Sequence, residues 1–262
     1  MQCILRFSLL LVFLNSAVVY SAGQIQSLET RRGAQQYFYV SASQDAVATV
    51  ILFVGGKGKL LLRKKGSKKL FNSNNFLARS RQLFKKQKFN LIYVDAPSDH
   101  LSPSGMFGFR ASPQHAEDIG LVVNYARKFS LPVWLIGTSR GTESVVNAII
   151  RLPKKGIDID GIVLTASMTE KNKRGVAVSE MNVSQITVPV LIISHKNDAC
   201  RFTTPLGSKK LSQQLKRSVR VKFKLVSAGD KPVSRPCKAR SAHGFWGIES
   251  EVVELIGQFI RQ

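Results

Sequence analysis

The chain has 262 residues, 44% hydrophobic and 21% charged, which suits one large globular domain, although the length would also accommodate two small ones. Its formal net charge of +23 either attracts anionic membranes, lipopolysaccharide or nucleic acid, or simply gives a well-solvated surface. Aromatic residues are not interleaved with the charges as a base-stacking platform requires, so we expect no specific nucleic-acid binding.

Residues 1–22 have the pattern of a secretory signal peptide. Arg6 precedes an apolar run at 9–19, and small residues follow at 21–23. The alternative is a membrane anchor, but the run is short for a spanning helix, which needs about 20 apolar residues. We therefore predict a protein secreted or exported to the periplasm, with residues 23–262 as its mature domain.

Short apolar runs along the mature chain predict buried β-strands. Continuous apolar strands without a polar face are typical of a parallel sheet covered on both sides. These runs lie at 46–54, 90–95, 132–137, 161–166, 188–194 and 220–226.

Helical spacing of apolar residues alternates with these strands. The stripes lie at 119–129, 145–150 and 248–260, and Ser112-Pro113 is an N-terminal signal for the first of them. Strand and helix in steady alternation predict an α/β fold with a mostly parallel, doubly wound sheet and helices on both faces. Ligands of such sheets bind at the carboxyl ends of the strands.

Basic residues gather in two segments of the chain. Twelve lysines and arginines occur from Lys57 to Lys88 with no acidic residue between them, and a second stretch at 201–240 is interrupted only by Asp230. These segments are either a binding surface for an anionic envelope polymer or ordinary solvated faces.

Residues 137–141 (GTSRG) form a G-x-S-x-G motif between a predicted strand and a predicted helix. In this motif the serine occupies a strained turn, and glycines stand where a side chain would collide with backbone. The turn exposes the serine hydroxyl near a helix N-terminus, whose dipole favours negative charge. Ser139 is therefore the candidate nucleophile.

A serine nucleophile needs a base, and the base needs an orienting acid. Asp198 follows the strand at 188–194, and His243 lies in the loop before the last helix, so both suit the chain order serine, acid, histidine. Glu170, after the preceding strand, is the alternative acid. We expect the remaining histidines to be structural or exposed; they are His100, His115 and His195.

The oxyanion formed on attack needs two backbone N–H donors. The first candidate is the amide of Arg140, which follows the nucleophile. The second is Gly56, in the glycine-rich loop 55–58 after the first predicted strand, where backbone approaches substrate closely. The alternative for Gly56 is a simple flexible turn.

Cys200 and Cys237 are the cysteines that remain once the leader and its Cys3 are removed. An even pair in an exported protein predicts a disulfide. This bridge would connect the loop of Asp198 to the loop of His243.

With these motifs, the sequence resembles the α/β-hydrolase family over nearly the whole mature chain. The resemblance implies an α/β-hydrolase fold with an eight-stranded sheet, and neither metal nor organic cofactor. The segment after the strand at 161–166, where lid domains usually enter, is short, so we expect an open site without a large cap. The motifs that carry the resemblance are GTSRG at 137–141, VGGKG at 54–58, NDAC at 197–200, AHGFWGIE at 242–249 and, for a narrower set of small exported bacterial hydrolases, NFLARSR at 75–81 and DAPSD at 95–99.

Two functions follow from these features. The first is a monomeric serine hydrolase that cleaves a carboxylic ester or related acyl bond of a small-molecule or lipid-like substrate, through an acyl-enzyme. The second is a non-catalytic protein of the same fold that binds anionic envelope polymers by its basic surface. The complete set of matched candidate groups favours the first.

Overall fold

The computed structural model describes residues 23–62 and 69–262. The predicted signal peptide at 1–22 lies outside the described residues, as do four basic residues of the Lys57–Lys88 segment. Among the helices that are described, none is long and apolar enough to cross a membrane.

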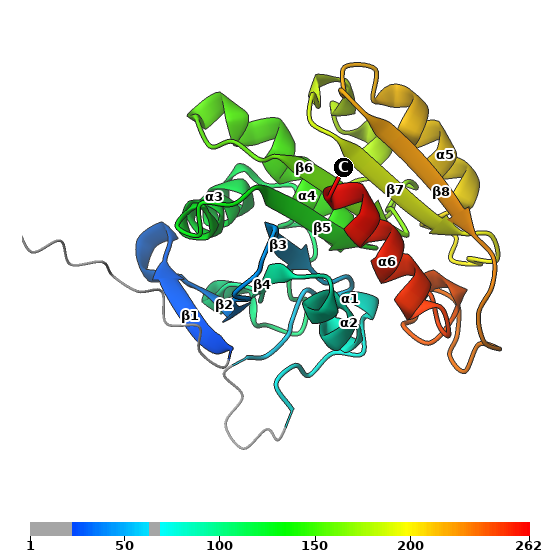
Figure 1. Cartoon of the computed structure of the whole chain (residues 1–262), viewed down its shortest axis with the longest axis horizontal. Helices are drawn as coiled ribbons and strands as arrows, with labels where there is room; N and C mark the ends of the chain where they lie inside the picture. Colours follow the sequence, from blue (N-terminus) through cyan, green and yellow to red (C-terminus); the bar gives the residue numbers. More distant parts are fainter. Residues whose placement is uncertain (1–22, 63–68) are drawn as a thin grey trace, which may run out of the picture.

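A twisted eight-stranded sheet forms the centre of the protein (Figure 1), in the order β1-β2-β4-β3-β5-β6-β7-β8. The pairings β1 with β2 and β2 with β4 are antiparallel, and the others are parallel. The sheet is therefore mostly parallel, as predicted. The strands are β1 (Gln24–Glu29), β2 (Gln35–Ser41), β3 (Ala48–Phe53), β4 (Phe89–Val94), β5 (Val133–Thr138), β6 (Gly161–Thr165), β7 (Val190–His195) and β8 (Val221–Val226).

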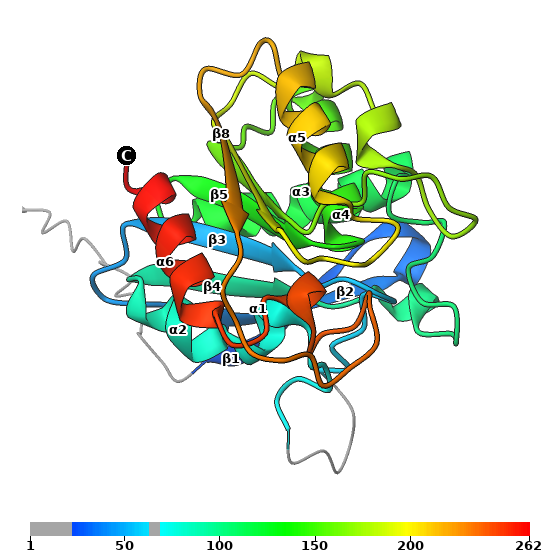
Figure 2. The same ribbon diagram turned by 90° about the vertical axis from the view of Figure 1, so that its right-hand side faces the viewer.

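Helices cover both faces of this sheet, with α1, α2 and α6 on one side and α3, α4 and α5 on the other (Figure 2). Each face has its own apolar cluster, because side chains alternate along every central strand. The parallel strands are thus buried from both sides, which explains their continuous apolar runs. The helices are α1 (Phe76–Arg79), α2 (Arg81–Lys86), α3 (Pro113–Arg127), α4 (Gly141–Arg151), α5 (Pro205–Gln214) and α6 (Glu249–Ile260).

The predicted start of α3 is confirmed by its cap. The Ser112 side chain accepts a hydrogen bond from the His115 amide at 3.1 Å, and Pro113 occupies the first turn, where its missing N–H costs no hydrogen bond.

The edges of the sheet differ from the expectation. β1 and β2 were not predicted, because β1 alternates exposed and half-buried residues instead of forming an apolar run. The strand expected at 220–226 exists as β8, but it is not buried on both faces. As the last strand of the sheet it is mostly half-buried, and Leu225 is 50% exposed.

Candidate active site

Ser139 lies in a sharp turn between β5 and α4, at the carboxyl edge of the parallel strands. Its φ of +55° falls in the left-handed region, which costs a non-glycine residue about 1–3 kcal/mol. The flanking glycines are required by close packing, since a Cβ on Gly141 would lie 1.9 Å from the carbonyl oxygen of Phe53. The chain therefore holds the Ser139 hydroxyl at the sheet edge by a strained conformation.

His243 and Asp198 meet at this edge from separate loops. The Nδ1 atom of His243 lies 3.0 Å from Oδ2 of Asp198, and both side chains are almost completely buried. Asp198 Oδ1 accepts a second hydrogen bond from the Cys200 amide at 2.9 Å. An acceptor at Nδ1 keeps a proton on that nitrogen and leaves Nε2 free to act as a base.

Thr203 completes this pair and was not predicted. Its hydroxyl donates to Asp198 Oδ2 at 2.8 Å and lies 3.0 Å from His243 Nδ1. The side chain is fully buried, so the contact excludes water from the carboxylate. A single threonine in a loop, distant in sequence from His243, carries no signal that would reveal this role.

Ser139 and His243 line the same cavity, of about 530 Å³, which we call the Ser139 cavity. Within the described residues Ser139 Oγ has no hydrogen bond to His243; it contacts Sδ of Met168 at 3.9 Å. The two side chains therefore share the cavity without a direct hydrogen bond in this structure. Other residues that line the cavity include Gly55, Gly56, Lys57, Asn75, Phe107, Arg174 and Lys238.

The loop after β3 approaches Ser139 closely. A Cβ on Gly55 would lie 2.9 Å from the Ser139 Cβ and 2.8 Å from the Thr138 carbonyl oxygen, so only glycine fits there. In the part of the chain that is described, the amides of Gly56 and Arg140 donate no hydrogen bond, so both N–H groups remain available to a ligand.

Asp95, at the end of β4, anchors the continuation of this loop. Its carboxylate accepts hydrogen bonds from the amides of Leu60 at 2.6 Å, Leu62 at 2.9 Å and Ala96 at 2.8 Å. Burial raises the pKa of the Asp95 carboxyl, while these N–H groups act in the opposite direction. Asp95 belongs to the DAPSD motif, which therefore has a positioning role.

A second buried group supports the loop from beneath. Arg110 donates to the Val54 carbonyl at 2.8 Å and to the Ser144 hydroxyl at 2.7 Å. Complete burial lowers the pKa of Arg110 to about 10. The backbone that leads into Gly55 and Gly56 is thereby tied to α4.

Arg79, from the NFLARSR motif, ties α1 to the loop of His243. Its guanidinium pairs with Glu249 at 2.7 Å and donates to the carbonyl of Gly244, the neighbour of His243. It also lies over the Trp246 ring, 5.5 Å from the ring centre. The motif thus holds the histidine loop against the first helix.

The predicted disulfide between Cys200 and Cys237 is present, with Cα atoms 4.6 Å apart. Cys237 lines the Ser139 cavity, and the Cys200 amide contacts Asp198. The bridge therefore connects the Asp198 loop directly to the segment that precedes His243.

Asp198, Cys200 and His243 offer ligand atoms within 4.8 Å of one another, the spacing of a metal site. Cys200 is oxidised, however, so its sulfur cannot serve as a thiolate ligand. Asp198 and Thr203 already occupy the Nδ1 side of His243. These residues do not fit a metal while the bridge is intact.

The alternative candidates lie elsewhere. Glu170 accepts from the Thr204 hydroxyl at 3.0 Å and does not contact His243. His195 is buried, with Nε2 bonded to the Ala228 carbonyl and Nδ1 to the Asn197 amide. His115 is also buried, whereas His100 pairs with Asp99 near the surface.

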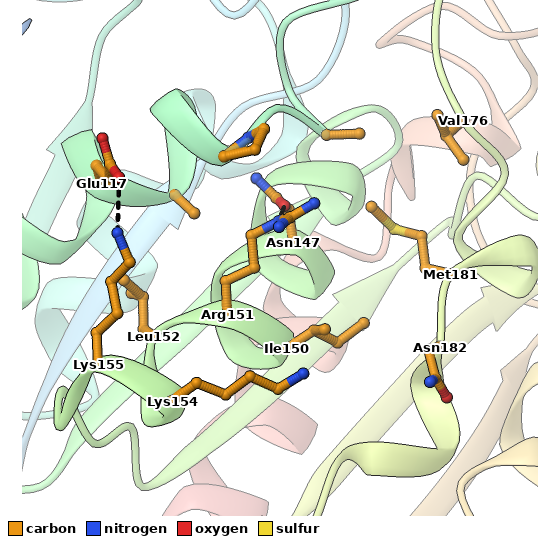
Figure 3. Close-up of a pocket in the computed structure, with 13 residues that line it drawn as sticks. Glu117, Asn147, Ile150, Arg151, Leu152, Lys154, Lys155, Val176, Met181 and Asn182 are labelled. Carbon is orange, nitrogen blue, oxygen red and sulfur yellow. Dashed lines mark hydrogen bonds and ion pairs between the residues drawn. The ribbon is translucent and has the colours of Figure 1, made fainter.

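A cavity of about 590 Å³ between α3, α4 and the segment around Met181 is separate from these residues (Figure 3). Two of its cations are engaged: Lys155 pairs with Glu117 at 2.6 Å, and Arg151 donates to Asn147 at 2.8 Å. The described residues that line it include no serine, threonine, cysteine or histidine, and its carboxylate, Glu117, is paired with Lys155, so we place no chemistry there.

The segment between β6 and β7 contains two 3-10 turns, Val178–Glu180 and Val183–Gln185, and no large cap within its described residues 166–189. Its first part nevertheless lines the site, through Met168 and Arg174.

No family model matches the sequence, and no curated protein is significantly similar to it. Solved structures are similar in fold. An esterase from Pyrococcus furiosus has a TM-score of 0.65 and 13% identity, covering 92% of each chain. An esterase from Rhizomucor miehei has a TM-score of 0.62 and 12% identity, covering 94% of this chain and 84% of that one. A protein from Agrobacterium tumefaciens, proposed to be an α/β hydrolase, has a TM-score of 0.61 and 15% identity, covering 91% of this chain and 95% of that one. The chain therefore has the α/β-hydrolase fold.

Proposed function

We propose that this protein is a serine hydrolase that cleaves a carboxylic ester or a related acyl bond through Ser139, His243 and Asp198. One observation carries the proposal: a serine in a strained strand–helix turn and a histidine held by a buried carboxylate open into the same cavity. The esterases of similar fold agree with this chemistry.

In the proposed reaction, His243 Nε2 takes the proton of Ser139 Oγ as the oxygen attacks the acyl carbon. Asp198 stabilises the imidazolium that forms, and the Gly56 and Arg140 amides stabilise the oxyanion. Collapse of the intermediate breaks the acyl–oxygen bond, and His243 returns the proton to the leaving alcohol. Water then releases the acid from the acyl-serine by the same steps.

The location and mature form belong to the same proposal. We infer that residues 1–22 are removed during export and that the domain acts as a monomer in the periplasm or outside the cell. The Cys200–Cys237 bridge supports this, because disulfides persist in oxidising compartments.

Labelling with a fluorophosphonate tests the function. The folded protein is expected to form one covalent adduct, which peptide mass spectrometry assigns to Ser139, while the heat-denatured protein forms none. An adduct at another serine would refute the assignment. Absence of labelling, together with absence of turnover of esters, thioesters and amides, would favour the non-catalytic binding protein.

Reduction of the disulfide is expected to lower turnover before it unfolds the protein. The bridge connects the loops of Asp198 and His243, whereas neither apolar cluster of the sheet includes Cys200 or Cys237. Its removal also costs about 4 kcal/mol of stability by the chain-entropy estimate. Turnover and circular dichroism are followed across a dithiothreitol titration, with the Cys200→Ser/Cys237→Ser variant as the reductant-insensitive control. Unchanged turnover after complete reduction would contradict this role.

A further inference from the structure

A strongly basic cavity of about 630 Å³ adjoins the Ser139 cavity. It is formed where the segment after β6 meets the loop after β7. We call it the basic cavity. The residues that line it are Arg140, Glu170, Lys171, Asn172, Lys173, Arg174, Arg201 and Phe202.

Most of the positive charge in the basic cavity is not neutralised. Five cationic side chains line it against one carboxylate, that of Glu170. Arg140 is paired with the buried Glu143 at 3.0 Å. The other four cations form no ion pair with a carboxylate anywhere in the described part of the chain. Glu170 accepts from the Thr204 hydroxyl instead.

Two arginines connect this cavity to Ser139. Arg140 follows the serine directly, and Arg174 lines both cavities. Their guanidinium groups lie 5.1 and 5.2 Å from the centre of the Phe107 ring, which itself lines the Ser139 cavity. Because Arg174 lines both cavities, an anionic group of a substrate bound at Ser139 can contact its guanidinium.

The backbone that carries these cations is ordered. Asn172 accepts from the Arg174 amide at 2.9 Å and from the Arg140 guanidinium. The Arg174 carbonyl accepts from the Gly108 amide at 3.0 Å, and Asn172 bridges to Gly175. A fixed backbone holds the base of each cationic side chain in place, so less conformational freedom is lost on binding an anion than in a flexible loop.

The burial of Arg140 is a further feature that favours an anion in the basic cavity. Burial lowers the pKa of Arg140, partly opposed by Glu143, and the nearby Arg174 lowers it further. The buried Arg140 guanidinium and the exposed Arg174 guanidinium repel each other, and an anion beside them stabilises both.

We propose that the basic cavity is a subsite for a carboxylate or phosphate group of the substrate, so that the protein prefers anionic esters over neutral ones. This rests on the proposed hydrolase function, because it places the anion relative to an acyl group at Ser139. It differs from general attraction by the net charge, because it assigns the preference to Arg174, Lys173 and Arg201.

Matched esters test this subsite. On the leaving-group side, 3-acetoxybenzoate and 3-acetoxyphenyl phosphate are compared with neutral 3-acetoxybenzamide. On the acyl side, mono(4-nitrophenyl) glutarate is compared with its carboxamide. We expect kcat/KM to favour at least one anionic ester over its neutral partner. We also expect the ratio of the two kcat/KM values, anionic over neutral, to fall about tenfold in Arg174→Gln and in Lys173→Gln/Arg201→Gln.

The control is Lys209→Gln/Lys216→Gln, which removes two exposed lysines that line neither cavity. This control variant should retain the ratio of kcat/KM for the anionic ester to kcat/KM for the neutral ester. An equal fall of the ratio in the control would assign the preference to net charge and would overturn the subsite. Absence of any preference for anionic esters would overturn it as well.

Binding separates this inference from the proposed function. Equilibrium titration of the Ser139→Ala protein with the same esters needs no turnover. Tighter binding of an anionic ester than of its neutral partner, lost when Arg174→Gln is added, supports the subsite even if no ester is hydrolysed. Equal binding of both members of every pair refutes it even if neutral esters are hydrolysed.

Discussion

Ser139→Ala is expected to lower kcat for a neutral ester by roughly 10⁴- to 10⁶-fold, the loss that follows removal of a catalytic serine elsewhere. Alanine removes the atom that attacks the acyl carbon, and the oxyanion donors alone provide only a small part of the acceleration. The initial rate of 4-nitrophenolate release measures the loss, with active-site titration of the unmodified protein as reference.

The stability of this variant should not decrease. Among residues 23–62 and 69–262, the only hydrogen-bonding contact of Ser139 Oγ is the one with Met168 at 3.9 Å, so its loss removes little from the folded state. Thermal unfolding therefore separates chemistry from folding. Ser144→Ala is an unsuitable control, because that hydroxyl contacts Arg110 and His115. Retention of more than about a hundredth of the rate would exclude Ser139 as the nucleophile.

Much of the fold could be predicted because burial leaves a local record in the sequence. The strands β3 to β7 are covered on both faces, so each is a largely apolar run, and α3 and α6 each bury one stripe, whereas α4 is buried on all sides from Gly141 to Ile149. The G-x-S-x-G motif also has a local cause, since the backbone of β3 passes too close to Gly141 for a side chain.

The elements and site residues that were not predicted from the sequence depend on contacts between distant segments of the chain. β1 is the edge strand and alternates exposed and half-buried residues, and β2 joins it to β4 by antiparallel pairing between segments distant along the chain. α5 has few buried residues, Ser208 and Leu211 among them, which is too few for a clear stripe. Thr203 acts through Asp198 and His243, and the three meet only in the folded chain.

The arrangement of the cationic residues could likewise be predicted only in part. The excess of cations was evident in the sequence, but which of them converge was not. Arg140 lies in the G-x-S-x-G turn and Arg174 in the segment after the strand at 161–166, and both guanidinium groups lie over the Phe107 ring. Lys59, in the first basic segment, donates to the carbonyls of Leu101 and Ser102, so it stabilises a loop as well as lining the Ser139 cavity.

Asp198→Asn is expected to lower kcat by about 10⁴-fold while the fold persists. Asparagine keeps the size of the side chain, but its amide can present N–H₂ to His243 Nδ1, which then becomes the acceptor and moves the proton to Nε2. A protonated Nε2 cannot take the proton of Ser139.

The geometry gives this prediction two controls. Thr203→Val keeps the carboxylate 3.0 Å from His243 and removes only the shared hydroxyl, so its loss should be far smaller than that of Asp198→Asn. Glu170→Gln should reduce turnover of a neutral ester little, because Glu170 contacts Thr204 and not His243. Steady-state kinetics of all three variants on one neutral ester decide the assignment. A larger loss in Glu170→Gln than in Asp198→Asn would contradict this assignment. It would identify Glu170 as the acid that orients His243 during turnover and leave Asp198 as a structural partner of the histidine.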